Sequence, residues 1–113
     1  MGRGQAPASR LTSVTRVWLH SEALADLAAA REWYEAQQHG LGNEFIDAVD
    51  RALKSLRAFP SAYPVEYRDA RRVLIERFPY CLFYRAEEED LVVVVACLHA
   101  ARDPKRQRRR LRG

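Results

Sequence analysis

The chain has 113 residues, of which 48% are hydrophobic and 30% charged, a balance typical of one globular domain with a single core. No apolar stretch approaches the length of about 18 residues that crosses a membrane, and the first residues lack the apolar segment of a secretory signal. The sequence therefore predicts a cytoplasmic protein. Cys81 and Cys97 fit no zinc motif and are expected to be buried free thiols.

The net charge of +4 is unevenly distributed. Residues 14–101 carry 10 basic and 14 acidic side chains, which gives that body a charge of −4. Residues 102–113 carry 7 basic side chains and 1 acidic one, a charge of +6, and Arg3 and Arg10 supply the remaining +2. Such a basic end attracts polyanions or an acidic protein partner through a long-range, salt-sensitive field. The alternative interpretation is a solvated, disordered end.

The first predicted elements are a strand and a helix. Residues 1–13 are small and polar, without periodicity, and are expected to be disordered. Residues 14–20 are rich enough in β-branched and aromatic side chains to form a strand. Ser21 stands where a helix N-cap is expected, and Gly40 marks the end of that helix. The apolar stripe between them recurs at helical spacing and consists of Ala23, Leu27, Ala30 and Tyr34.

A second helix and three strands follow. The helix is predicted from about Asn43 to Ala58 and ends before Pro60, so the two helices form an antiparallel hairpin. A loop follows over 60–64. The remaining strands are predicted at 71–77, 80–86 and 91–98, and the nearly all-apolar last strand is expected to be buried on both faces.

These elements predict an α+β fold: an N-terminal strand, an antiparallel helix hairpin and a three-stranded antiparallel meander. Residues 14–104 form its single domain, and residues 105–113 form a basic C-terminal tail. The helix pair covers one apolar face of the sheet, and the first strand joins an edge. The other face is expected to be free and to carry the function.

Motifs for most catalytic chemistries are missing. The sequence has no nucleophile elbow, no H-E-x-x-H or C-x-x-C pair and no glycine-rich phosphate loop, so neither metal nor cofactor is expected. Metal-free RNA cleavage needs a base, an acid and a cation for the charged transition state. His99, Arg102 and Arg72 could fill these roles. Alternatively, His99 bonds a neighbouring carbonyl group, and Arg72 and Arg85 pair with nearby glutamates.

Several local motifs, in this order, resemble the ParE/RelE superfamily of bacterial toxins from type II toxin–antitoxin modules. The resemblance extends over about residues 17–104. The motifs are the S-x-x-A-x-x-D-L-like helix start at Ser21, Pro60 after the second helix, an arginine-rich strand, PYCLFYR at 79–85 and LHAARDP at 98–104. The resemblance implies the fold predicted above.

The superfamily has two activities. RelE-like members are ribosome-dependent mRNA endonucleases with an arginine after the first tyrosine of the third strand and usually a C-terminal tyrosine. Here Cys81 follows Tyr80, Leu74 is apolar where such enzymes often carry lysine, and no tyrosine occurs after Tyr84. ParE-like members share the fold without this set, and the LHAARDP ending is more similar to theirs. The resemblance therefore favours a ParE-like inhibitor of DNA gyrase.

The resemblance also implies partners. A cognate antitoxin with an acidic C-terminal segment would fold over the toxin in a hetero-oligomer. DNA gyrase is the expected target, and the ribosome with its mRNA is the target under the nuclease alternative. A non-toxic binding module is the second alternative. The residues expected to contact the target are Arg72, Arg85, His99, Arg102, Lys105 and Arg106.

Overall fold

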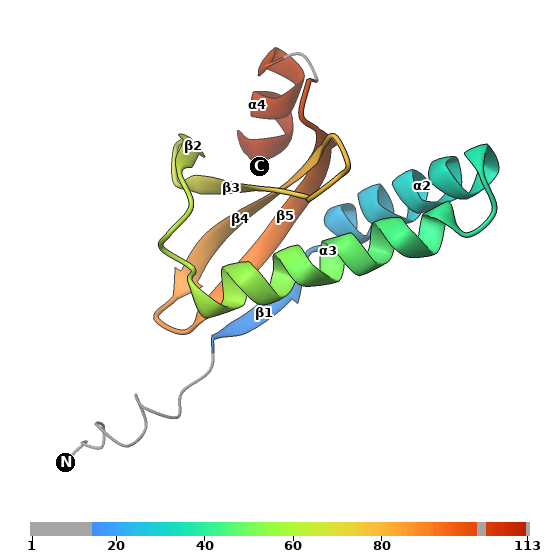
Figure 1. Ribbon diagram of the computed structural model, residues 1–113. Helices are drawn as coiled ribbons and strands as arrows, with labels where there is room; N and C mark the ends of the chain where they lie inside the picture. Colours follow the sequence, from blue (N-terminus) through green and yellow to red (C-terminus); the bar gives the residue numbers. More distant parts are fainter. Residues whose placement is uncertain (1–14, 102–103, 113) are drawn as a thin grey trace.

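Two long helices, α2 (Ser21–Gln37) and α3 (Leu41–Ala58), form the antiparallel hairpin that the sequence predicts. The computed structural model describes residues 15–101 and 104–112. Figure 1 shows the two helices side by side along the sheet. No helix in the described part of the chain combines the length and apolar character that a membrane crossing requires.

Local contacts fix where α2 begins. Its N-cap is His20 rather than the predicted Ser21, because the His20 Nδ1 atom accepts a hydrogen bond of 3.1 Å from the Glu22 N–H. The imidazole nitrogen thus satisfies one of the amide groups that a first helical turn leaves free. Ser21 is instead the first residue of the helix.

The turn between α2 and α3 depends on two glycines. Gly40 has a φ of +89°, a left-handed conformation that glycine adopts without steric cost. A Cβ atom on Gly42 would lie 2.9 Å from the carbonyl oxygen of Arg31, so a side chain there would push the helices apart. The Glu35 carboxylate accepts hydrogen bonds from the N–H groups of both glycines, each at 3.0 Å. These contacts let α3 begin at Leu41, two residues before the predicted start.

The sheet has five strands in the order β1-β5-β4-β3-β2. Their bounds are Arg16–Leu19 (β1), Val65–Tyr67 (β2), Ala70–Leu74 (β3), Tyr80–Glu88 (β4) and Leu91–His99 (β5). Strand β1 lies at an edge, as predicted, and pairs in parallel with β5, whereas all other pairs are antiparallel. The predicted α+β fold is confirmed. The short β2 is an addition to the prediction, and β3 ends three residues before the predicted 77.

A bulge at Val95 changes which side chains of β5 face the hairpin. Phe83 pairs with Ala96 and Tyr84 with Val94, so Val95 is an extra residue in its strand. Below the bulge Val92 and Val94 pack in the hairpin-side core, and above it Cys97 does. Ala96 and Leu98 pack in a smaller core on the opposite face of the sheet, so β5 is buried on both faces, as predicted, and this explains its continuous apolar run.

The core between the hairpin and the sheet is rich in aromatic rings. Phe45 of α3 is fully buried and lies within about 5.6 Å, centroid to centroid, of the rings of Tyr34, Phe78 and Tyr80. The Tyr84 hydroxyl donates a 2.6 Å hydrogen bond to the Pro60 carbonyl oxygen, which attaches the loop after α3 to β4. These contacts join α2, α3, β4 and the loops that contain Pro60 and Phe78.

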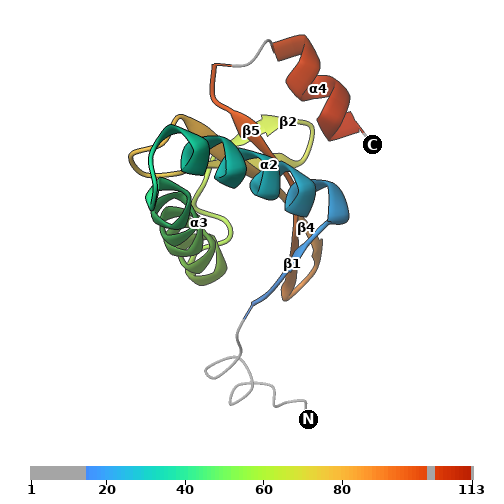
Figure 2. The same ribbon diagram turned by 90° about the vertical axis from the view of Figure 1, so that its right-hand side faces the viewer.

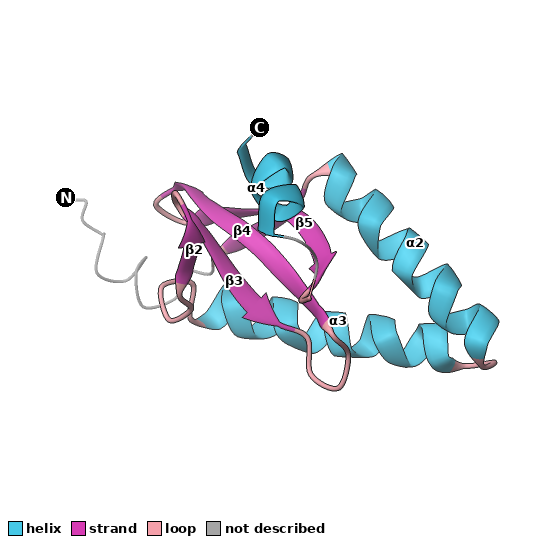
Figure 3. Cartoon of the chain, turned by 90° about the horizontal axis from the view of Figure 1, so that it is seen from above, coloured by secondary structure: helices cyan, strands magenta, loops and turns pink. Residues whose placement is uncertain are grey.

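The other face of the sheet is partly covered by a fourth helix, α4 (Pro104–Arg112). Figures 2 and 3 show α4 beside the β4–β5 part of the sheet, away from α3. Its Leu111 side chain is 1% exposed and packs with Cys81, Phe83 and Leu98. The prediction that this face is free is therefore wrong where α4 lies, because the basic tail contains one leucine that closes a second, smaller core.

Candidate interaction surfaces

A groove of about 430 Å³ lies between α3 and the free edge of β3, and is called the α3–β3 groove. Its wall on α3 is formed largely by Ala48, Ala52 and Ser55. Its rim carries charge, because Arg51 lies 3.8 Å from Glu76 across the opening. The remaining lining residues are Tyr63, Pro64, Arg72, Val73 and Leu74. The groove thus combines an apolar wall with a polar rim, as peptide-binding grooves do.

The β3 edge beside the groove is only partly paired. Strand β2 pairs with Ala70 and Arg71, and the Arg72 N–H donates to the Pro64 carbonyl oxygen at 3.0 Å. Beyond that point no strand in the described residues covers the outer edge at Leu74, whose side chain is 62% exposed. An open strand edge is a template for pairing with another chain. The edge and the groove together form a surface suited to an extended, partly apolar segment.

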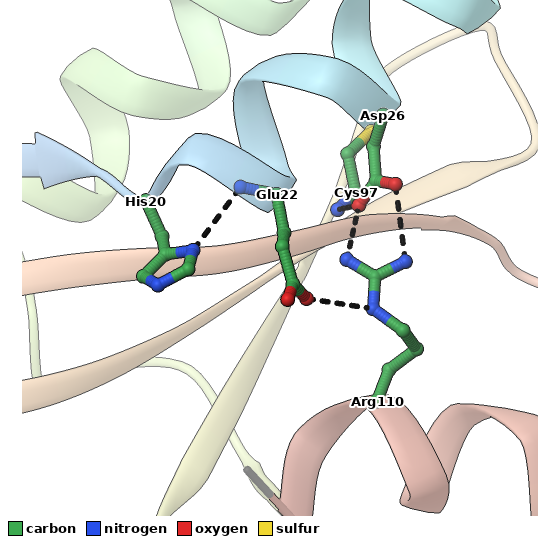
Figure 4. A network of polar contacts seen from close by, with 5 residues as sticks. All are labelled: His20, Glu22, Asp26, Cys97 and Arg110. Atoms are coloured by element: carbon green, nitrogen blue, oxygen red, sulfur yellow. Dashed lines mark hydrogen bonds and ion pairs between the residues drawn. The ribbon is translucent and has the colours of Figure 1, made fainter.

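Arg110 attaches helix α4 to α2. The Arg110 guanidinium donates hydrogen bonds to both carboxylate oxygens of Asp26 in α2, at 3.1 and 2.8 Å (Figure 4). The same Asp26 accepts a 3.0 Å hydrogen bond from the backbone N–H of Cys97 in β5. One carboxylate therefore joins α2, β5 and α4.

This ion pair is partly shielded from water. The side chain of Asp26 is 17% exposed, and its hydrogen bonds raise the pKa of Arg110. The Arg110 Nε atom makes no hydrogen bond among the described residues, although Glu22 lies within ion-pair distance at 3.4 Å. A bidentate pair of this kind fixes orientation as well as charge, so it sets the angle at which α4 lies on the sheet.

A second arginine holds the C-terminal end of α4. Arg85 of β4 donates to the carbonyl oxygen of Leu111, where a cation also interacts favourably with the helix dipole. Its Nε lies 2.6 Å from Asp69, and this hydrogen bond lowers the pKa of the Asp69 carboxyl. Because the Arg85 side chain is only 14% exposed, it serves the internal structure rather than presenting a charge to solvent.

The opposite side of α4 carries exposed cations and is called the α4 outer face. The helix docks through Gln107, Arg110 and Leu111, which share one side at spacings of three and four residues. The exposed cations are Lys105, Arg106, Arg108, Arg109 and Arg112. The helix therefore separates one docking side from one strongly positive side.

Two residues considered for RNA cleavage lie on opposite faces of the sheet. Arg72 pairs with Phe83 of β4, on the α4 side, and forms a 3.4 Å ion pair with Glu66. The His99 ring packs at 5.3 Å from the ring of Tyr80, on the hairpin side, and its Nδ1 accepts from the backbone of Ala101. The ladder spacing separates their Cα atoms by about 14 Å. The two side chains therefore do not converge on one point.

The other predicted site residues are dispersed as well. Arg102 lies outside the described residues. Lys105 and Arg106 belong to the α4 outer face, and Arg85 is engaged with α4 and Asp69. The sequence interpretation did not identify the attachment through Asp26 and Arg110. The sequence feature that could have indicated a docked helix was Leu111, the only leucine, isoleucine or valine from 104 to 112, which lies on the same helix face as Arg110.

The two cysteines are buried free thiols, as predicted. Burial raises the pKa of Cys97 to about 12, and Asp26 adds to the effect, while burial also raises the pKa of Cys81. Both thiols therefore stay protonated at neutral pH, which makes them poor nucleophiles. Within residues 15–101 and 104–112, no three His, Cys, Asp or Glu side chains are grouped so as to hold a metal ion.

The fold and its surfaces define a small α+β protein with a helix hairpin on one face of a five-stranded sheet, a peptide-sized groove and a cationic helix. A family model described as the ParE toxin of the type II toxin–antitoxin system parDE matches residues 17–104. The chain belongs to this family.

A solved structure gives the same fold. It is titled the chromosomal ParDE TA system from P. aeruginosa and superposes with a TM-score of 0.67 at 17% identity, covering 75% of this chain and 95% of that one. No curated protein sequence matches the chain. The family match ends at Pro104, so the rest of α4 lies beyond it.

Proposed function

We propose that the chain is a toxin that inhibits DNA gyrase by binding to it and is neutralised by a cognate antitoxin. Membership of the ParE toxin family supports the toxin role. The observation that favours binding over RNA cleavage is the placement of Arg72 and His99 on opposite faces of the sheet. A general base and a phosphate-binding cation must contact the same phosphodiester, and these two side chains do not. The target is cytoplasmic, and the protein would act there.

The antitoxin is proposed to bind along the α3–β3 groove. The solved relative is titled a ParDE system, which supports a partner chain for this protein too. An extended antitoxin segment could pair with the open edge at Leu74 and place apolar side chains against Ala48 and Ala52. The rim residues Arg51 and Arg72 would attract acidic side chains of that segment and so favour rapid association. The product is a hetero-oligomer.

The target surface is proposed to include Lys105 and Arg106, which face outward from α4, and His99 at the end of β5. Arg102, which lies outside the described residues, remains part of this proposal from the sequence. Arg85 contributes by holding α4 in place. The substitution Arg85→Gln removes that support and leaves the outward cations unchanged. It is therefore expected to weaken toxicity less than removal of residues 105–113, provided both variants remain folded.

A supercoiling assay with purified gyrase and relaxed plasmid tests the proposal, beside an in-vitro translation reaction in which the mRNA is followed by primer extension. Inhibited supercoiling with intact mRNA is the expected result. Cleavage of the mRNA on ribosomes would contradict gyrase inhibition and support the nuclease alternative. If neither assay responds and induction without antitoxin leaves growth unchanged, the chain is a binding module and the proposal is wrong.

A control addresses the antitoxin site in the same assays. The pair Arg51→Glu and Lys54→Glu reverses one charge on the rim of the α3–β3 groove and one exposed charge of α3 outside the groove. Co-expressed antitoxin is expected to rescue growth from the Lys54→Glu toxin and to fail with the Arg51→Glu toxin. Equal rescue of two folded, toxic variants would move the antitoxin site elsewhere.

A further inference from the structure

The positive and negative charges of the molecule lie in different regions, which the net charge does not reveal. Among the described residues, 104–112 contain six basic and no acidic side chains, whereas residues 15–101 carry 10 basic and 14 acidic ones. The helix α4 is thus +6 on a body of −4. An anionic partner that approaches this molecule is attracted at α4 and repelled over much of the body, which defines one docking orientation.

The arginines on the outer face of α4 take no part in the docking contacts between α4 and the other described residues. The docking contacts come from Gln107, Arg110 and Leu111, on the inner side. By contrast, the guanidinium groups of Arg106, Arg108, Arg109 and Arg112 form no ion pair with any described residue. Their charge therefore remains available to a ligand.

The outer face also carries an electrostatic cost that a polyanion would relieve. Arg108 and Arg112 are four residues apart, and Arg106 and Arg109 are three apart, so like charges meet along the helix. Each such pair destabilises a helix by about 0.2–0.5 kcal/mol. The helix persists because Leu111 and Arg110 dock it. A row of phosphates would replace this repulsion between arginines with attraction to the phosphates.

We propose that the outer face of α4 binds the phosphate backbone of duplex DNA, without reading its sequence. The proposal goes beyond gyrase inhibition and does not depend on it. Nine residues of helix span about 13.5 Å, close to the width of about 12 Å of the DNA major groove, so several arginines can reach phosphates at once. Arginine is suited to this role because its planar fork matches phosphate oxygens.

An acidic protein segment fits this face less well. Tight binding between folding segments needs apolar burial, and the single aliphatic side chain of α4, Leu111, is already buried in the protein's own core. A phosphate backbone requires only cations.

The test uses the full chain and a fluorescein-labelled DNA duplex of about 20 base pairs, followed by fluorescence anisotropy at several salt concentrations between about 50 and 200 mM. Wild-type protein is expected to bind with a Kd of about 10⁻⁶ to 10⁻⁴ M, with a log–log salt slope of about −3 to −4 for four phosphates. Absence of salt-dependent binding at the lowest salt concentration would overturn the proposal.

Two double variants with the same net charge localise the effect. Arg108→Gln with Arg109→Gln removes two outer-face cations, and Arg51→Gln with Lys54→Gln removes two exposed cations from α3. The α4 variant is expected to weaken binding about 10-fold and to reduce the slope by about 1.8, whereas the control changes the Kd less than about 2-fold. Equal weakening of DNA binding in both double variants would show an effect of net charge alone and would contradict the proposal.

A competitor separates DNA from acidic protein. Polyglutamate added at the same charge concentration as unlabelled duplex is expected to displace labelled DNA far less effectively. If polyglutamate displaces the labelled DNA as effectively as unlabelled duplex at equal charge, the face binds acidic protein segments instead. Circular dichroism of each variant confirms that α4 and the fold remain. Since no gyrase is present, a negative result here leaves gyrase inhibition unaffected.

Discussion

The two faces of the sheet are covered in different ways. On the hairpin side, α2 and α3 contribute nine buried side chains, from Ala23 to Leu56, to a core that also includes side chains of β3, β4 and β5 and the loop residues Ile75 and Phe78. On the other side, α4 contributes only Leu111 to a smaller cluster, and its other contacts include hydrogen bonds and the ion pair with Asp26. The hairpin is therefore part of the cooperative fold, whereas α4 is an added element whose docking and outward charge are separable.

The polar contacts of the two faces follow the same division. Glu35 accepts the N–H groups of Gly40 and Gly42 and closes the hairpin turn within one local segment. Asp26 instead joins Arg110 across 84 positions of the sequence. The local contact forms with the helices themselves, while the distant one needs the sheet to be in place before α4 can dock.

The largest expected effect is on the hairpin side. Phe45→Ala is predicted to lower the free energy of unfolding by about 3–5 kcal/mol, because it leaves a cavity among the rings of Tyr34, Phe78 and Tyr80. Urea unfolding followed by circular dichroism measures the change. Leu24→Ala, on the exposed side of α2, is the control and is expected to change stability by less than about 0.5 kcal/mol. Similar losses in both variants would contradict the assigned core.

A smaller effect is expected on the α4 side. Leu111→Ala removes the one apolar anchor of α4, yet the helix can detach instead of leaving a cavity. The loss of global stability is therefore predicted to stay below the range of about 2–5 kcal/mol for a buried leucine, while trypsin cleavage within 104–112 accelerates. Arg109→Lys, on the outer face, is the control for both measurements because it keeps the trypsin site. Unchanged proteolysis in Leu111→Ala would argue against docking through this side chain.

The smallest effect concerns pH. Hydrogen bonds from the Gly40 and Gly42 N–H groups lower the pKa of Glu35 from its usual value of 4.5. A lowered folded-state pKa stabilises the fold fully above about pH 4.5 and loses that contribution as the pH falls through the folded-state value. Between pH 6 and 3, roughly, Glu35→Gln is thus predicted to lose less stability than wild type. The melting temperatures of wild type and Glu35→Gln are measured across this range. If both fall equally with pH, Glu35 does not contribute to the pH dependence of stability.

Residue patterns alone predicted most of the fold. The hairpin was predicted from the helical stripe between Ala23 and Tyr34 and from Gly40, and the inner strand from the apolar run 91–98. These features are local patterns in the sequence, which is why they could be recognised. Strand β2 was not predicted because three residues, two of them exposed, carry too little pattern. The N-cap was assigned one residue late because a histidine took the role usually filled by serine.

The surfaces were harder to predict than the fold. The charge of the tail was clear from composition, but its folding into α4 depends on one leucine and on Asp26, 84 positions before Arg110. No local pattern encodes such a contact. The pairing of Arg72 with the α4 side and of His99 with the hairpin side likewise depends on the strand register, which includes the bulge at Val95.

The separability of α4 from the hairpin is tested most directly by native-state hydrogen exchange of the full chain, followed by mass spectrometry at low, increasing urea. The amides of 104–112 are expected to exchange through a local opening whose free energy is well below that of α2 and α3 and is insensitive to urea. If the amides of α4 and of the hairpin exchange only together, with the urea dependence of global unfolding, α4 is an integral part of the fold and is not separable from the hairpin.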